Sequence, residues 1–577
     1  MSFLRTLIDE LRRRRVFRVV AGYAVAAWVV VQVANDTFPA LQFPDWALTL
    51  VVVCALLGFP VALALAWAFD LTPEGVRRGR VYAGLAVLAI VMLAASAFFV
   101  RGRDAARSST AGATVEAVSV PASIAVLPFA DLSAAGDQEY FGSGLAEELL
   151  NVLARTEGLR VAARTSSFAF AGTEAPVTEI GAQLGVEAVL EGSVRESNGT
   201  IRITAQLIDA RTGYHLWSDA YTRELSDVFA IQDEIAAAIA NALELRLVGG
   251  DDASPRRARP RDPEAFQLYL RGRYAWNQRT LEGIRESVSY FEQALQLDPA
   301  YALAYTGLAD AYMLLEDVDA LSREEAFAKG GAAARRALQL DETLAEAHTS
   351  LAHILMHQLE YDESEREYLR ALALNPNLST AHQWYSLLLS QMQRWDEALE
   401  YATRAAELDP LSIAPARSVG VVLYLARRPD ESVSHFEAVL ERHPDSEELL
   451  GWLGWAHLQA GRADTASALW TRLRGQYGAE YYQAPLAAGL AASGRAEAAR
   501  RMLTELEREF RGPPPYPFQI AIAYGYLSDL DRAFQWLDRA ADDREPYLDF
   551  VEIEPAFDPL RGDRRFQAIL RKTGHMR

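Results

Sequence analysis

The sequence predicts a multi-domain protein made of a three-helix transmembrane anchor, an α/β domain and an all-α superhelical solenoid. Three observations lead to this fold class. The first hundred residues hold three apolar runs, residues 122–248 alternate strand-like and helix-like stretches, and the second half repeats itself every 34 residues. At 577 residues the chain is too long for one hydrophobic core, so several domains are expected.

The predicted anchor covers residues 16–100, with spans at about 17–34, 46–69 and 81–100. Each run is near the ~20 residues that cross a bilayer as a helix. Residues 1–15 form an amphipathic head. Nine arginines lie in that head, at Arg18 just after it, and between the second and third spans, which favours a cytoplasmic N-terminus. We therefore expect a multi-pass inner-membrane protein of a Gram-negative bacterium, with its large C-terminal part in the periplasm. A signal peptide is the alternative for the first run.

A linker over residues 101–121 leads into the predicted α/β domain at 122–248. Strands are expected at 124–129, 159–164, 188–196, 200–209 and 214–223, and helices at 140–155, 177–184 and 227–247. Asn198-Gly199 suits a two-residue hairpin between the third and fourth of these strands.

After a second linker at 249–262, residues 263–546 are predicted to form eight helical repeats. Glu342, Pro376, Pro410 and Pro444 occupy one equivalent position and are each 34 residues apart; Pro299 precedes Glu342 by 43. A 34-residue period of two amphipathic helices is typical of tetratricopeptide (TPR) repeats, which must stack to bury their apolar faces. Residues 547–577 are expected to cap the last repeat.

The inner face of the first helix of each repeat is predicted to line a concave groove that binds a protein or peptide. An alternative is that the tryptophans of this set fill space between repeats. The repeat register gives these candidate binding residues: Trp276, Arg279, Asp310, Met313, His353, His357, Gln383, Leu387, Gln391, Arg417, Tyr424 and Trp455. Aromatic and arginine side chains on a curved surface are typical of binding hot spots.

Four segments resemble the TolB amino-terminal-type (FlgO-like) domain: IAVLPFADLS, EYFGSGLAEELLNVLAR, LGVEAVLEGSVRES and RITAQLIDARTGYHLWSDAY. The whole chain resembles bacterial membrane proteins in which this domain precedes TPR repeats. The resemblance implies a TolB-N-like interaction module without enzymatic activity. Many such relatives carry a DNA-binding or cyclase domain at the amino terminus, and this chain shows neither motif.

Other chemistry is weakly indicated. Gly142-Ser143-Gly144 could hold an anion at a helix N-terminus, but a turn with a helix cap is the simpler interpretation. His348, His353 and His357 could chelate zinc, or could serve as groove or packing residues. A single cysteine, Cys54, allows no disulfide framework, and the net charge of −20 disfavours nucleic acid.

The sequence therefore predicts a non-enzymatic, membrane-anchored TPR scaffold that binds protein partners in the periplasm, with no catalytic residue, metal or cofactor. The alternative is a transmembrane sensor or signalling adaptor that relays ligand or partner binding to a separate cytoplasmic protein. The sequence leaves the identity of the partner and the oligomeric state open.

Overall fold

The structure, a computed structural model, describes residues 69–72, 75–78, 123–133, 136–156, 158–197, 200–224, 228–243, 260–317, 320–509 and 516–576. The chain divides into two compact units, Met1–Ser119 and Val120–Arg577. In the first unit, strands β1 (Phe69–Thr72) and β2 (Gly75–Arg78) pair antiparallel, with Leu71 opposite Val76.

One finding contradicts both the predicted transmembrane anchor and the predicted multi-pass inner-membrane location. No helix among the described residues is long and apolar enough to cross a membrane. The longest of those helices, α12 (Arg323–Leu340), has 18 residues and carries charged side chains along its length, whereas a span needs ~20 apolar residues. The head at 1–15 and the spans predicted at 17–34, 46–69 and 81–100 lie outside the described residues, apart from Phe69 in β1. The described fold is a helical solenoid with a small sheet domain.

The sheet domain opens the second unit. Its strands are β3 (Ser123–Val126), β4 (Ala130–Asp131), β5 (Arg160–Val161), β6 (Ala188–Ser197), β7 (Thr200–Asp209) and β8 (His215–Glu224), in the order β5-β3-β6-β7-β8, with β4 also paired to β6. The strand β3 runs parallel to β5 and β6, while β6, β7 and β8 form an antiparallel meander.

Side chains alternate between the two faces of this sheet, so each face needs its own helical cover. Ile124, Leu190 and Ile203 share a core with helices α5 (Glu139–Leu153) and α8 (Val228–Ala242). Ala125 and Val189 point to the other face and pack with α7 (Val177–Leu184). A short helix, α6 (Arg164–Phe168), follows β5.

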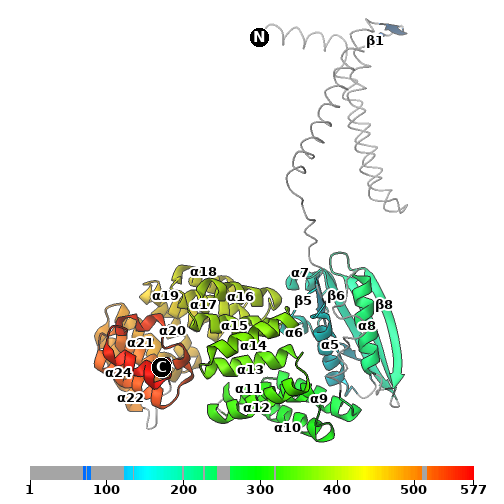
Figure 1. The fold of residues 1–577 in the computed structure, drawn as a ribbon. Helices are drawn as coiled ribbons and strands as arrows, with labels where there is room; N and C mark the ends of the chain where they lie inside the picture. The colour runs from blue at the N-terminus through cyan, green and yellow to red at the C-terminus, as the bar shows by residue number, and fades with distance from the viewer. Residues whose placement is uncertain are drawn as a thin grey trace. The chain divides into compact units, whose positions relative to one another are not determined.

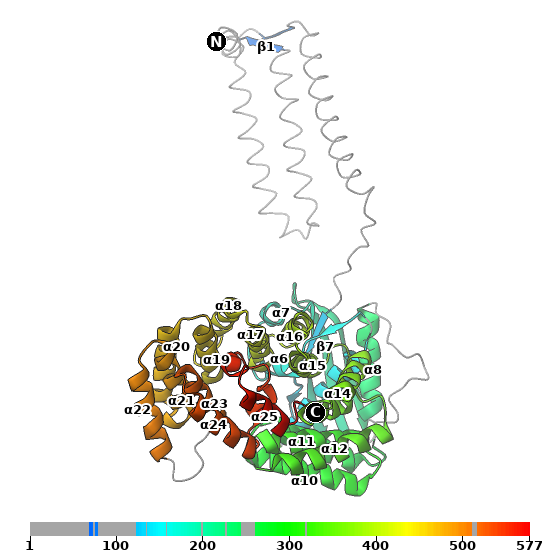
Figure 2. The same ribbon diagram turned by 60° about the vertical axis from the view of Figure 1, so that its left-hand side comes forward.

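The solenoid consists of consecutive helix pairs (Figures 1 and 2). Their bounds are α9 (Pro263–Asn277), α10 (Leu281–Leu297), α11 (Ala302–Asp317), α12, α13 (Ala345–His357), α14 (Tyr361–Leu374), α15 (Ser379–Gln391), α16 (Trp395–Leu408), α17 (Ile413–Leu425), α18 (Pro429–Leu440), α19 (Glu447–Gln459), α20 (Ala463–Tyr477), α21 (Ala479–Ala492), α22 (Ala496–Glu509), α23 (Pro517–Tyr526) and α24 (Leu530–Asp542). The segment after α24 forms two 3₁₀ helices, η2 (Pro546–Phe550) and η3 (Pro555–Leu560), and then α25 (Arg564–Lys572).

Small residues set how closely the two helices of a pair approach. A Cβ atom on Gly454 would lie 2.5 Å from the indole nitrogen of Trp470, and one on Gly420 would collide with the ring of Phe436. Both large rings are fully buried. Because protein interiors are close-packed, the missing Cβ is what gives each ring its place.

The sheet domain and the repeats share one core. The amide nitrogen of Asn377, in the loop after α14, donates to the carbonyl oxygens of Ala154 and Leu159 at 2.9 Å each. In the loop after α16, Asp409 Oδ1 accepts from Ser166 Oγ at 2.5 Å and from the Ser166 backbone nitrogen at 3.0 Å. The cyan sheet domain accordingly lies against the green helices of the first repeats (Figure 1).

Candidate functional site

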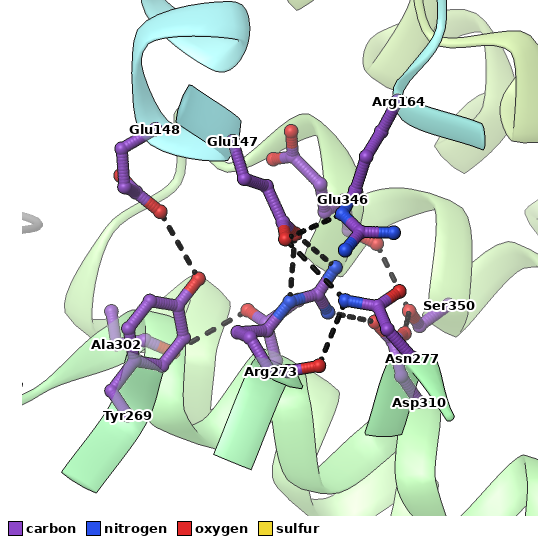
Figure 3. A network of polar contacts seen from close by, with 11 residues as sticks. Glu147, Glu148, Arg164, Tyr269, Arg273, Asn277, Ala302, Asp310, Glu346 and Ser350 are labelled. Carbon is purple, nitrogen blue, oxygen red and sulfur yellow. Dashed lines mark hydrogen bonds and ion pairs between the residues drawn. The ribbon is translucent and has the colours of Figure 1, made fainter. Parts of the chain in front are cut away.

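Helix α5 of the sheet domain faces the first helices of the early repeats, where its glutamates join a polar network (Figure 3). Arg273, on α9, donates from Nη2 to Glu147 Oε1 at 2.5 Å, and Arg164 donates from Nε to Glu147 Oε2 at 2.9 Å. Arg273 also pairs with Asp310 at 3.3 Å, and Ser350 Oγ donates to Asp310 Oδ1 at 2.6 Å. The predicted groove residue Asp310 is therefore engaged inside the molecule.

Burial and ion pairing compete in this network. Burial raises the pKa of the Glu147 carboxyl, but Arg273 and Arg164 outweigh it, so the net pKa lies below the ordinary value. Burial, together with the charges of Glu147 and Glu346, raises the pKa of the neighbouring Glu148 to about 7. Tyr269 Oη donates to Glu148 Oε1 at 3.3 Å.

Trp276 and Arg279 lie at the end of α9. The guanidinium of Arg279 is 3.7 Å from the centre of the Trp276 ring, and that of Arg273 is 4.6 Å away. The Trp276 ring is partly buried and packs against the buried cluster of Ile284, Ala311 and Leu315. This tryptophan therefore combines interhelical packing with two cation–π contacts.

The middle of the inner face meets the C-terminal segment. His353 stacks on Trp384 with ring centres 4.0 Å apart and meets His357 edge-on at 4.6 Å. His357 Nδ1 lies 2.6 Å from Asp549 Oδ2, and Arg323 pairs with the same carboxylate at 3.2 Å.

Titration of this middle cluster follows its contacts. Burial, together with His357 and Arg323, holds the pKa of His353 well below its ordinary value. Burial raises the pKa of Asp549, but His357 and Arg323 more than offset it and lower the net value. The cluster therefore favours an ionised Asp549 and a neutral His353.

Three further predicted residues are buried in this middle part. Met313 packs with Phe327 and Ile354. Gln383 and Gln391 are 8% and 7% exposed. The Gln391 amide atoms make no hydrogen bond within the described part of the chain. None of the three presents an open surface.

The last repeats leave a cavity of about 530 Å³, which we call the aromatic cavity. It holds four of the predicted groove residues and nine aromatic side chains. Its lining residues are Leu387, Arg417, Ser418, Val421, Tyr424, Leu425, Glu447, Glu448, Gly451, Trp452, Trp455, Trp470, Tyr481, Tyr482, Pro485, Phe518, Gln519, Ile522, Tyr547, Phe550 and Glu554.

Polar contacts hold the wall of the aromatic cavity in place. Tyr482 Oη donates to Glu447 Oε1 at 2.7 Å, and Arg417 forms an ion pair with Glu448. Tyr424 donates to Glu554, which joins α17 to the segment after η2. The C-terminal segment therefore supplies one side of the cavity.

Sequence reasoning missed Trp452, Tyr481, Phe518, Tyr547 and Phe550. Trp452 lies three residues before Trp455, so it belongs to the same helical face and could have been found by extending the set one turn. Tyr481 and Phe518 are on α21 and α23, where the repeat signature is weak. Tyr547 and Phe550 enter from a segment whose path no periodic pattern reveals.

Gly142 and Gly144 lie within α5, and contacts account for both. A Cβ on Gly144 would lie 2.6 Å from the side chain of Leu270 on α9, and one on Gly142 would collide with the carbonyl oxygen of Phe129. The glycines thus permit close packing of α5 on the sheet domain and on the repeats.

The comparisons with known proteins establish the class of the helical region. Family models described as tetratricopeptide repeat match residues 349–413 and 423–489. The chain therefore contains TPR repeats and carries a TPR-type protein-interaction scaffold.

A Rhizobium meliloti (strain 1021) protein named "Putative adenylate cyclase 3" is 41% identical over 187 residues. The match spans 32% of this chain and 32% of that protein's length, so most of each chain lies outside it.

Similar solved structures include Pseudomonas aeruginosa PilF (20% identity, 37% of this chain, 94% of that chain, TM-score 0.30). They also include YrrB, described as a TPR protein with an unusual peptide-binding site (20% identity, 32% and 91% coverage, TM-score 0.25). PilW, a type IV pilus biogenesis factor, matches at 19% identity over 36% of this chain and 93% of its own, with a TM-score of 0.31.

Proposed function

We propose that the repeats are a scaffold that captures an extended segment of a protein partner in the aromatic cavity, without catalysis. One observation carries this proposal: nine aromatic side chains line a cavity of about 530 Å³ between α17, α19, α21 and α23. This volume is within the range of ~300–1,000 Å³ typical of binding pockets. Rigid aromatic rings contribute large contact areas to interfaces at low entropic cost.

The rest of the inner face supports the choice of this cavity. Glu147 of the sheet domain reaches Arg273, and Asp549 of the C-terminal segment reaches His357. These contacts occupy the inner helices of the first repeats. A partner that uses the inner face would therefore meet the last four repeats, where Tyr481 is 43% exposed and Tyr547 is 40% exposed.

The sheet domain is proposed to act as a non-catalytic interaction module, in line with its resemblance to the TolB amino-terminal-type domain. Gly144 packs on Leu270 of α9, so this glycine serves the contact between the domain and the repeats, whereas Gly142 packs on Phe129 within the domain. The relative named "Putative adenylate cyclase 3" matches this chain over 32% of that protein's length.

A second candidate is a signalling adaptor, in which partner binding to the repeats is relayed through the sheet domain to another protein. The buried Glu147–Arg273–Asp310 network favours this candidate because it joins α5, α9 and α11. A change in the position of α9 would break charge pairs that are costly to leave unmatched.

A photo-crosslinking amino acid placed in the full chain tests the scaffold proposal. The crosslinker replaces Tyr481 in the aromatic cavity or, as the matched control, Tyr477, an exposed tyrosine whose hydroxyl bonds to the Asp445 carbonyl outside the cavity. We expect protein adducts specific to position 481 in extracts of the native host, identified by mass spectrometry. Equal labelling from both positions would contradict the proposal.

A further inference from the structure

We infer that the partner segment places a lysine or arginine side chain in the aromatic cavity, an inference that rests on the proposed function. The charged residues of the lining are three glutamates, Glu447, Glu448 and Glu554, and one arginine, Arg417. The cavity wall therefore has a formal excess of two negative charges when all four side chains are ionised.

The contacts of these residues leave that excess uncompensated within the lining. Arg417 is paired with Glu448. Glu447 accepts one hydrogen bond from the neutral hydroxyl of Tyr482 at 2.7 Å. A carboxylate offers about four acceptor positions, so one hydroxyl does not saturate it.

Glu554 is the most buried acid of the wall, and it accepts from the Tyr424 hydroxyl and from the Ala556 backbone nitrogen. Burial raises the pKa of its carboxyl above the ordinary value, and those two donors, with Arg561 and Arg427, only partly offset it. A cation beside it would favour the charged carboxylate, so binding a cation and ionising Glu554 would reinforce each other.

The aromatic rings supply the second attraction. A guanidinium or ammonium group over the face of Trp or Tyr is attracted by the negative face of the ring, and the attraction is stronger when water is excluded. The same chain already uses this contact, because Arg279 and Arg273 lie 3.7 and 4.6 Å from the centre of the Trp276 ring. In the aromatic cavity, Trp452, Trp455 and Tyr481 line the same space as the three glutamates.

Anionic and neutral occupants fit this surface less well. An acidic side chain would be desolvated next to unmatched carboxylates, which costs free energy. A norleucine side chain would gain apolar contact but would bring no positive charge to balance the excess of carboxylates. The net charge of −20 on the chain also accelerates encounters with a basic segment.

Binding of defined peptide pools to the full chain tests the inference. Each pool contains acetylated heptapeptide amides with one fixed central residue (arginine, lysine, norleucine, glutamine or glutamate) and mixed alanine, leucine, serine and tyrosine flanks. Affinity is measured by tryptophan fluorescence and calorimetry. We expect the arginine and lysine pools to bind about 10-fold more tightly than the norleucine pool, as cation–π contact with a partly desolvated cation implies, and the glutamate pool to bind most weakly.

Matched variants tie that preference to the aromatic cavity. Glu447→Gln keeps an acceptor for Tyr482 and removes one negative charge. It should weaken binding of the arginine pool about 5-fold and leave binding of the norleucine pool unchanged. Glu505→Gln changes an exposed glutamate on α22 and should alter neither. Tyr481→Ala removes a half-exposed ring and should weaken both pools, whereas Tyr477→Ala should not.

The outcomes separate the inference from the proposed function. In one outcome, the norleucine or glutamate pool binds as tightly as the arginine pool, or more tightly, and still loses affinity for the Tyr481→Ala protein. That result would overturn the cationic occupant and keep the scaffold. If no pool binds, or if Tyr481→Ala has no effect, both are overturned. Raising the sodium chloride concentration should weaken binding of the arginine pool but not of the norleucine pool, because salt screens charge attraction. This salt dependence would support the inference.

Discussion

His357 Nδ1 lies 2.6 Å from Asp549 Oδ2, although the two residues are 192 positions apart in the chain. In an open solenoid each repeat contacts only its neighbours. Here the segment after the last helix pair returns to the second and third pairs, where Asp549 meets Arg323 of α12 as well as His357 of α13. The contact ties the C-terminal segment back to these earlier repeats, and the same segment places Phe550 and Glu554 in the wall of the aromatic cavity.

Asp549→Asn should therefore destabilise the protein. Arg323 would keep Glu316 as its partner at 2.9 Å but lose the Asp549 charge in a largely buried setting. Removing one member of a buried pair costs ~3–5 kcal/mol, and partial exposure of Arg323 reduces this to about 2 kcal/mol. Urea unfolding of the full chain measures the loss, and Asp362→Asn, on the exposed side of α14, should change stability by less than ~0.5 kcal/mol.

The same pair makes stability sensitive to acid. The folded pKa of Asp549 lies below its ordinary value of 3.8, so its contribution is present above that value and is lost as the pH falls through the folded pKa. The fall in unfolding free energy below about pH 4 should be less steep in Asp549→Asn than in the wild type. Parallel pH profiles of the two proteins would contradict this assignment.

Glu148→Gln should act in the opposite pH range. The folded pKa is about 7, above the ordinary 4.5, so the folded protein holds this proton more tightly than the unfolded chain. Its stabilising contribution is complete below pH 4.5 and is lost as the pH rises through 7. Because the group is coupled to Glu147, we expect the free energy of unfolding to change by about 2 kcal/mol over this range. Melting temperatures between pH 5 and 8 should fall less in Glu148→Gln, while the exposed Glu282→Gln should follow the wild type.

Gly420→Ala should disrupt the packing of α17 on α18. Its new methyl group would collide with the buried Phe436 ring, and such overpacking costs ~1–3 kcal/mol. Gly475, within α20, has open space where a Cβ would lie, so Gly475→Ala should instead stabilise by ~0.5–1 kcal/mol through helix propensity. Urea midpoints that shift in the same direction for both variants would refute this assignment of the two glycines.

Asn377→Ala should loosen the joint between the sheet domain and the repeats. The carbonyl groups of Ala154 and Leu159 would lose their buried amide donor, at a cost of ~1–3 kcal/mol. Hydrogen exchange should then rise around residues 154–163 while α19 and α20 remain protected. Unchanged exchange at 154–163 would show that the joint does not depend on this amide.

Several elements follow from local pattern. Strand β7 occupies residues 200–209, as its alternation predicts, and β8 lies one residue from its predicted position. The strand predicted at 159–164 is shorter, because β5 covers Arg160–Val161 and α6 begins at Arg164. Hydropathy alone led to the transmembrane anchor, which the described helices contradict, because counting apolar residues in a window does not establish a helix that spans a membrane.

The sequence by itself determined the paired helices and the small residues between them, since a 3.6-residue periodicity and a missing Cβ at Gly420 or Gly454 act over one or two turns. It also predicted Tyr424 and Trp455 as groove residues, and both line the aromatic cavity. Only the tertiary structure decided which part of the inner face is open, because Glu147 and Asp549 reach it from segments far away in the chain. Those approaches depend on how the stacked pairs curve, and curvature accumulates from many small packing angles that no single repeat encodes.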